Sequence, residues 1–328
     1  MRMCLFLAKI CLLSLLVCLQ TSLPGQTRQG QASSITSALR AGQFDQALEL
    51  LRPALRSMPN NAQLWMFQGL AYSGKKDMKS ALASYQQALK VSPDYLPALE
   101  GAAQIQYESG SPDAIPLLEH VLKVRPTDVT SHAMLAMIHA RNGDCATAVR
   151  HFSQAGSALE SQPEALQGYG VCLLQLKQAD EAVRVFQQLI TSRPDDVRCR
   201  RALAVAQLAA DKPLDALTTV RPLLEENADV STMRLASAIY EANKDTPNAV
   251  KVLHDAIVKD PTQIGLYVDF AELAMDHQSF QAGVEMVDAG LKAQPNAPQL
   301  YMARGVLYVQ LADYEKAEDD FEKAERLD

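Results

Sequence analysis

The sequence lacks any apolar run long enough to cross a lipid bilayer. Its longest run of this kind, Ile10–Leu19, has ten residues broken only by Cys and Ser, whereas a transmembrane helix needs about 20. The run follows two basic residues and precedes a polar stretch over residues 20–31, an order typical of a secretory signal peptide. We therefore predict a signal peptide over residues 1–25, a linker over residues 26–31, and export of the mature chain.

Cys18 gives the leader a second interpretation. Residues 15–18 (Leu-Leu-Val-Cys) resemble a bacterial lipoprotein box, although Val17 stands where that family has Gly, Ala or Ser. A lipid on Cys18 would bring the mature chain to a membrane, although a single acyl chain anchors a protein only marginally. We expect a periplasmic location, with an outer-membrane lipoprotein or an extracellular protein as the alternatives.

Cysteine is scarce outside the leader. Of the six in the chain, only Cys145, Cys172 and Cys199 lie beyond it. An odd number of cysteines spread over a long chain does not form a disulfide framework. A bridge between Cys145 and Cys172 stays open, and it would need a Cα separation of roughly 4.4–6.8 Å.

The sequence also lacks the motifs of catalytic and cofactor sites. It contains no Gly-rich phosphate loop, no His-Glu-x-x-His and no Gly-x-Ser-x-Gly. His132 and His139 are the best pair of metal ligands, but two turns of helix would separate them by roughly 10.5 Å, too far for one zinc ion with Zn–N bonds of about 2 Å. We interpret both as partly exposed histidines and expect no enzyme activity, metal or cofactor in this chain.

Positive charge is in deficit. The chain has 31 Lys and Arg against 38 Asp and Glu, a net charge of −7, and removal of Arg2 and Lys9 with the leader makes it −9. An acidic surface disfavours nucleic acid and anionic membranes. We expect a protein or peptide partner of unknown identity, no nucleic acid, and a membrane only if Cys18 is lipidated.

What the sequence does contain is a repeat. Small residues recur at intervals of 33 or 34 residues, at Ala47, Ala81, Ala114, Ala148, Ala182, Ala216, Ala249, Gly283 and Ala317. Prolines follow twelve residues after six of them, at Pro59, Pro93, Pro126, Pro194, Pro261 and Pro295. A fixed period of this length indicates an array of similar units, each of which packs on its neighbours.

The residues within the units point to a family. The unit at residues 62–95 carries Trp65, Gly69, Tyr72, Ala81, Tyr85, Ala88 and Pro93, and the same pattern returns in later units, for example as Ala182 with Phe186 and Ala317 with Phe321. The chain therefore resembles a tetratricopeptide repeat array over residues 28–328. The resemblance implies an all-α fold, a right-handed superhelical solenoid of antiparallel helix pairs. Repeats are expected at approximately 28–61, 62–95, 96–128, 129–162, 163–196, 197–229, 230–263, 264–297 and 298–328.

Some units depart from the pattern. The eighth carries Gly283 and Gly290 in its second helix, each costing about 1 kcal/mol relative to Ala, so we expect it to be the least stable. The pattern of the final helix predicts a cap, because its apolar residues are confined to Tyr314, Ala317, Phe321, Ala324 and Leu327. We interpret the acidic run Glu318, Asp319, Asp320 and Glu322 as a solvated helix face.

In the family that the chain resembles, the first helix of each pair lines a concave binding surface. The matching positions here are mostly apolar, at Met66, Leu70, Met137, Val171, Val205, Val268, Met302 and Val306, with basic exceptions at Arg198, Arg201 and Arg234. The Lys and Asn set by which some co-chaperones of the family clamp a terminal carboxylate is absent. We predict a groove that holds an amphipathic helix or an extended peptide carrying an acidic residue. In the alternative interpretation, the apolar residues form inter-repeat core and the arginines extend over it.

Together these features predict a non-catalytic protein-binding scaffold or assembly adaptor of a bacterial cell envelope. One alternative is a lipid-anchored structural component of an outer-membrane assembly or secretion complex. Another is the helical arm of a catalytic complex whose active site lies in a different chain.

Overall fold

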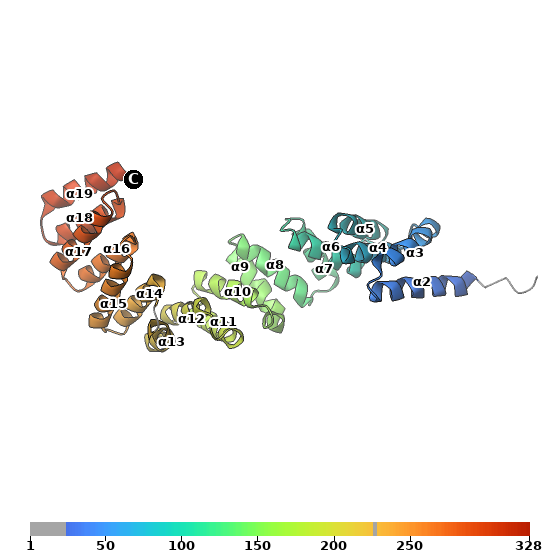
Figure 1. Cartoon of the computed structure of the whole chain (residues 1–328), viewed down its shortest axis with the longest axis horizontal. Helices are drawn as coiled ribbons and strands as arrows, with labels where there is room; N and C mark the ends of the chain where they lie inside the picture. Colours follow the sequence, from blue (N-terminus) through green and yellow to red (C-terminus); the bar gives the residue numbers. More distant parts are fainter. Residues whose placement is uncertain (1–23, 226–227) are drawn as a thin grey trace, which may run out of the picture. The chain divides into compact units, whose positions relative to one another are not determined.

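The computed structural model describes residues 24–225 and 228–328, and all regular structure within them is helical (Figure 1). Residues 1–23 of the predicted signal peptide, which include Cys18, lie outside the described residues. The α-helices follow one another in pairs: α2 (Pro24–Arg40) with α3 (Phe44–Ser57), α4 (Ala62–Gly74) with α5 (Met78–Val91), α6 (Leu96–Glu108) with α7 (Ala114–Val124), α8 (Val129–Arg141) with α9 (Cys145–Ala155), α10 (Pro163–Gln175) with α11 (Ala179–Ser192), α12 (Val197–Ala209) with α13 (Pro213–Glu225), α14 (Val230–Ala242) with α15 (Thr246–Lys259), α16 (Ile264–Asp276) with α17 (Phe280–Ala293), and α18 (Pro298–Gln310) with α19 (Tyr314–Leu327). The all-α array of antiparallel helix pairs expected from the sequence is confirmed.

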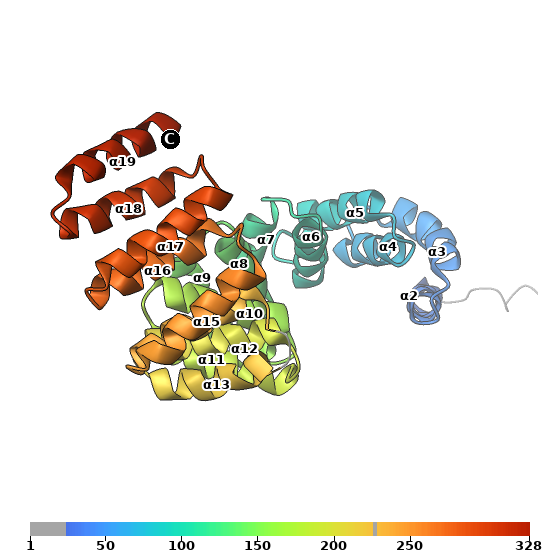
Figure 2. The ribbon, with the colours of Figure 1, turned by 60° about the vertical axis from the view of Figure 1, so that its left-hand side comes forward.

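Contacts divide the described residues into two units, the first comprising residues 24–138 with 153–156, the second residues 139–152 with 157–225 and 228–328. In the second unit α16 packs on both α17 and α18, and α18 packs on α19 (Figure 2). The core of this part is a cluster that includes Leu253, Tyr267, Val287 and Leu300. None of the described helices has the length and hydropathy needed to cross a membrane.

The turn within each helix pair contains one residue with a left-handed backbone. These residues are Gly42, Lys76, Gly110, Gly143, Lys177, Asp211, Lys244, Gln278 and Ala312, with φ between 54° and 78°. They recur at the same 33 or 34 residue interval as the small residues. Six of the nine are not glycine, although this conformation disfavours a side chain, so the sequence gives little sign of the turn.

The repeating small residues permit close contact between helices. All eight alanines of the ladder are buried, with exposed fractions of 0–3%. On the partner helices, a Cβ added to Gly69 would lie 2.5 Å from the ring of Tyr85, and one added to Gly170 would lie 2.5 Å from the ring of Phe186. Backbone and ring therefore touch where the sequence pairs a glycine with an aromatic residue.

Tyr85 shows how one ring joins two repeats. Its ring also lies 2.5 Å from the position of a Cβ on Gly101, so it fits between the backbones of α4 and α6. The side chain is only 4% exposed, and burial raises the pKa of its hydroxyl. The ring of Tyr85 therefore packs against its own helix pair and against the first helix of the next pair.

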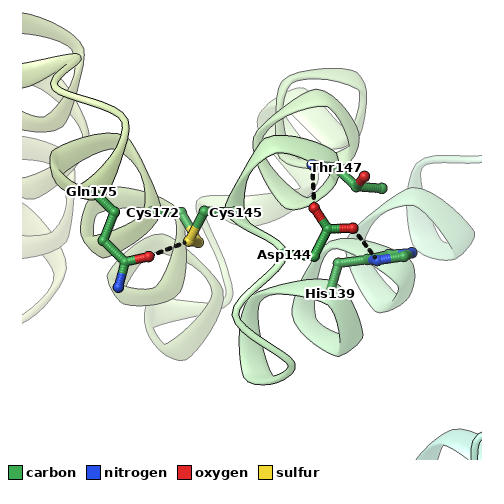
Figure 3. Close-up of a disulfide and its surroundings, with 6 residues drawn as sticks. All are labelled: His139, Asp144, Cys145, Thr147, Cys172 and Gln175. Atoms are coloured by element: carbon green, nitrogen blue, oxygen red, sulfur yellow. Dashed lines mark hydrogen bonds and ion pairs between the residues drawn. A yellow bond between two sulfur atoms is a disulfide. The ribbon is translucent and has the colours of Figure 1, made fainter.

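A bridge joins Cys145 at the start of α9 to Cys172 on α10, with a Cα separation of 4.9 Å (Figure 3). The start of α9 is held next to it by Asp144, which accepts a hydrogen bond from the backbone N–H of Thr147 at 3.1 Å. Gln175 Oε1 lies 2.9 Å from Cys145 Sγ. The pairing left open by the sequence is present, and Cys199 is a buried free cysteine.

Several expectations need correction. Residues 26–31, expected to be a linker, lie within α2. His132, expected to be partly exposed, is buried, and its Nε2 lies 3.1 Å from the carbonyl oxygen of Pro126. Tyr314 is 67% exposed and so does not belong to the buried stripe of α19.

Gly283 and Gly290 have low helix propensity, but close packing explains their presence in α17. A Cβ on Gly283 would lie 2.9 Å from Cβ of Ala274, and one on Gly290 would lie 2.8 Å from the ring of Tyr267. Both glycines let α17 approach α16 closely. The expectation that the eighth repeat is the least stable stays a prediction.

The acidic run in α19 is not uniformly solvated, because Asp320 is buried and 4% exposed. Its carboxylate accepts two hydrogen bonds from Arg304 of α18, from Nε at 2.7 Å and from a terminal nitrogen at 2.6 Å. Arg304 also pairs with Asp288 of α17 and lies over the rings of Tyr301 and Tyr308, at 5.6 and 5.8 Å. The guanidinium therefore ties three helices together.

We predict that Gly170→Ala lowers the free energy of unfolding by about 1–3 kcal/mol, because the added methyl group overpacks a buried ring. Gly265→Ala is the matched control, since its Cβ would meet nothing closer than 3.4 Å. Ala favours helix over Gly by up to about 1 kcal/mol, so the control should unfold at the wild-type denaturant concentration or above it. Equal losses in the two variants, measured by chemical denaturation, would contradict the close contact.

We also predict that Asp320→Ala destabilises the chain by about 3 kcal/mol, because it leaves a largely buried guanidinium short of a partner. Asp319→Ala, which removes the exposed neighbouring carboxylate, should change stability by less than about 0.5 kcal/mol. Thermal melts of both variants test this difference. A wild-type melting temperature for Asp320→Ala would restore the interpretation of a solvated acidic face.

Candidate functional site

Two hollows open along the first helices α14, α16 and α18, all within the second unit. The acidic hollow, between α14 and α16, has a volume of about 620 Å³ and is lined by residues that include Arg234, Glu241, Asp269, Glu272 and Asp276. The apolar hollow, over α16 and α18, has a volume of about 670 Å³ and is lined by residues that include Ile264, Val268, Met275, Met302 and Val306. These volumes are in the range of ligand-binding pockets.

The two hollows adjoin, because Arg234, Asp269 and Glu272 line both. We call the combined surface the α14–α18 groove. Its apolar end lies open, since Met302 is 49% and Val306 39% exposed. An exposed group of apolar side chains beside polar ones is typical of an interaction surface.

The alternative interpretation, in which the apolar first-helix residues are inter-repeat core, describes only some of them. Leu70, Val171 and Val205 have exposed fractions of 40–45%, similar to those of Met302 and Val306. In contrast, Met66 and Val268 are partly buried and pack on core clusters, and Met137 is also partly buried.

Arg234 does not present a free charge. Its Nε and one terminal nitrogen donate to the two carboxylate oxygens of Asp269, the second at 2.6 Å. The hydrogen bonds that Arg234 donates to Asp269 raise the pKa of Arg234 despite its partial burial. Such two-point pairs are the strong ones among charged hydrogen bonds.

The other two predicted arginines are engaged as well. Arg201 donates from one nitrogen to both oxygens of Asp229, at 2.7 and 2.9 Å, while Arg198 lies 3.4 Å from Asp196 of its own turn. Although burial acts to raise it, the pKa of Asp229 is lowered by hydrogen bonds from Thr232 and by the charge of Arg201. The arginines thus pair with the chain's own carboxylates, which disfavours the expected role of binding a partner's acidic residue.

Negative charge, by contrast, is left over in the acidic hollow. Glu272 and Asp276 are exposed on α16, and neither forms an ion pair among the described residues, although the charge of Glu272 acts on Arg234. Glu241 lies 2.7 Å from Nε2 of His277 and accepts a hydrogen bond from the hydroxyl of Thr246. Four carboxylates and one guanidinium therefore line this hollow.

The structure brings together only part of the predicted groove. Arg234, Val268, Met302 and Val306 line the α14–α18 groove. Val171, Arg198, Arg201 and Val205 lie on α10 and α12 of the same unit and line neither hollow, while Met66, Leu70 and Met137 belong to the first unit. The first unit has its own hollow of about 320 Å³ lined in part by Glu100, Arg125 and Asp128, whose charges pair with one another.

Sequence reasoning missed the carboxylates of the groove. Glu272 and Asp276 follow Val268 at intervals of four residues, so all three lie along one face of α16. Extending the first-helix positions by one and two turns would have found them.

Comparison with known proteins agrees with this architecture. The family model described as the tetratricopeptide domain of cytochrome c-type biogenesis protein H matches residues 42–166. General tetratricopeptide repeat models match residues 139–198, 173–238 and 268–328. The chain belongs to the tetratricopeptide repeat family.

Among curated relatives of this tetratricopeptide repeat protein is the human protein O-mannosyl-transferase TMTC3, 23% identical over 305 residues, which are 87% of this chain and 33% of that protein. Another is the formate-dependent nitrite reductase complex bifunctional subunit NrfFG of Haemophilus influenzae, 31% identical over 121 residues, which are 35% of this chain and 29% of that protein. The matches span from 13% to 34% of the relatives' own lengths.

Solved structures of the same kind include a tetratricopeptide repeat protein from Parabacteroides merdae, with a TM-score of 0.46, 19% identity, and coverage of 74% of this chain and 96% of that one. Yeast Tom70 has a TM-score of 0.44 and 15% identity, with coverage of 92% of this chain and 76% of that one. Tetratricopeptide repeat proteins generally bind protein partners and are generally non-catalytic.

Proposed function

We propose that this chain is a non-catalytic scaffold or assembly adaptor that holds a segment of a partner protein along the α14–α18 groove. The observation that carries the proposal is the open apolar surface of Val268, Met302 and Val306 beside charged residues that line the same hollow. A helical or extended segment buries its apolar side chains on such a surface. The repeats cover most of the chain and leave the first-helix face as the natural contact surface.

We further propose that the scaffold works in the cell envelope of a bacterium. The bridge between Cys145 and Cys172 supports this, because disulfides persist in oxidising compartments such as the periplasm. The match to the tetratricopeptide domain of a cytochrome c-type biogenesis protein supports it as well. The sequence of the leader, with its short apolar run after basic residues, agrees with export.

A second candidate is the helical arm of an enzyme complex. The Haemophilus relative is named as a subunit of the formate-dependent nitrite reductase complex and is 31% identical over the matched residues. In this role the chain would present an enzyme or its substrate protein without supplying catalytic groups itself. A catalytic subunit that co-purifies with the chain would favour this candidate over a free-standing adaptor.

Met302→Glu with Val306→Glu should remove the partners that the chain retains in affinity purification from the native envelope, because each change puts a charge into the apolar hollow. Both side chains are exposed, so the fold should persist. Val258→Glu on α15, where the wild-type side chain is 69% exposed, is the matched control and should keep the partners. Identical partner sets for all three proteins would exclude the groove.

The compartment has a separate test. Mass spectrometry of the protein isolated without reductant should find a mature start between residues of about 20 and 30 and a linked Cys145–Cys172 peptide. An acylated Cys18 would favour the lipid-anchored alternative. An intact Met1 with free Cys145 and Cys172 would contradict export.

A further inference from the structure

The chemistry of the α14–α18 groove, taken as the binding site of the proposed function, identifies the kind of segment that fits it. The groove joins an apolar end on α16 and α18 to an acidic end between α14 and α16. The join is formed by Arg234, Asp269 and Glu272, which line both hollows. A single occupant that fills the groove therefore meets both environments.

At the acidic end the chain's own cation is already used. Arg234 forms a two-point pair with Asp269, which cancels one positive and one negative charge. Glu272 and Asp276 then face the hollow without an ion-pair partner, one turn of α16 apart. Glu241 contributes further negative character, balanced only when His277 is protonated.

At the apolar end, large apolar side chains are exposed to solvent. Met302 and Val306 are exposed on adjacent turns of α18, opposite Val268 and Met275 of α16 across the hollow. Methionine adapts its shape to varied apolar side chains. An apolar side chain of a partner would fit against Met302 and Val306, whereas a charged side chain placed against them would lose its solvation.

We infer that the groove binds a peptide segment with apolar side chains on α16 and α18 and a Lys or Arg between Glu272 and Asp276. This reverses the acidic partner expected from the sequence, because Arg201 and Arg234 are paired with Asp229 and Asp269. Charge complementarity decides between the two occupants. A basic and apolar segment gains counter-charges at one end and apolar burial at the other, whereas an acidic segment would meet unpaired carboxylates.

The test is selection of binders to the full chain from a displayed library of random 12-residue peptides. The selected peptides should combine apolar residues with at least one Lys or Arg. Glu272→Gln with Asp276→Asn should weaken their binding at least tenfold, and salt at about 0.5 M should weaken wild-type binding as well because it screens exposed charges. Asp255→Asn with Glu285→Gln, which removes two exposed carboxylates from α15 and α17, is the control and should bind as wild type.

The outcomes separate this inference from the proposed function. Selected peptides that are acidic or neutral, lose binding with Met302→Glu plus Val306→Glu, and keep it with Glu272→Gln plus Asp276→Asn would overturn the basic segment and leave the groove intact. Peptides whose binding changes with neither pair of substitutions would overturn both. Loss of binding in the control variant to the same extent as in the groove variant would also overturn the inference, since it would show that overall negative charge alone attracts the peptides.

Discussion

The close approach of helix backbones at glycine and alanine governs how the helices of this chain pack. Tyr85 can lie between α4 and α6 only because Gly69 and Gly101 have no Cβ in its way. The pairs of Gly170 with Phe186 and of Gly305 with Phe321 repeat the contact in later repeats. Protein interiors pack densely, so an extra methyl group at such a contact would clash with the ring. The small residues therefore determine where along each helix its neighbours can pack.

This packing leaves one face of the first helices open. The ladder alanines and the aromatic rings are buried between helices, while Leu70, Val171, Val205, Met302 and Val306 on the first helices are 39–49% exposed. Ion pairs between successive repeats, such as Arg201 with Asp229 and Lys212 with Asp180, join residues 28 and 32 positions apart. Exposed pairs of this kind contribute little stability, but they use up cations and so set the charge that the open face presents.

The helix pairs and the buried ladder could be predicted from the sequence, because every repeat carries small and apolar residues at equivalent positions. A departure in one repeat does not hide a pattern that the other repeats share. Asp320 shows what such reasoning misses. Its burial depends on Arg304 of the preceding helix, a pair specific to one repeat, and the surrounding acidic residues give it the pattern of a solvated face. The bridge between Cys145 and Cys172 is likewise specific to two repeats, and no second bridge occurs among the residues that the structure describes.

The candidate site divides in the same way. The apolar residues of the groove occupy repeat positions and were found from the sequence. The carboxylates were not, because Glu272 and Asp276 matter only once Arg234 is seen to pair with Asp269. That pairing changes the expected partner from acidic to basic. It could not be predicted from Arg234 alone, because it depends on the position of Asp269 in the next repeat.

The packing of the repeats leaves the first-helix face of α14, α16 and α18 free for a partner. Photo-crosslinking in the native cell shows whether a partner occupies this face, with a photoreactive amino acid at position 302 of the full chain and, in a second protein, at position 258. Both positions are exposed, but only the first lies in the groove. A partner held in the groove should give a discrete protein adduct from position 302 and none from position 258, whereas adducts from position 258 alone would rule out the groove.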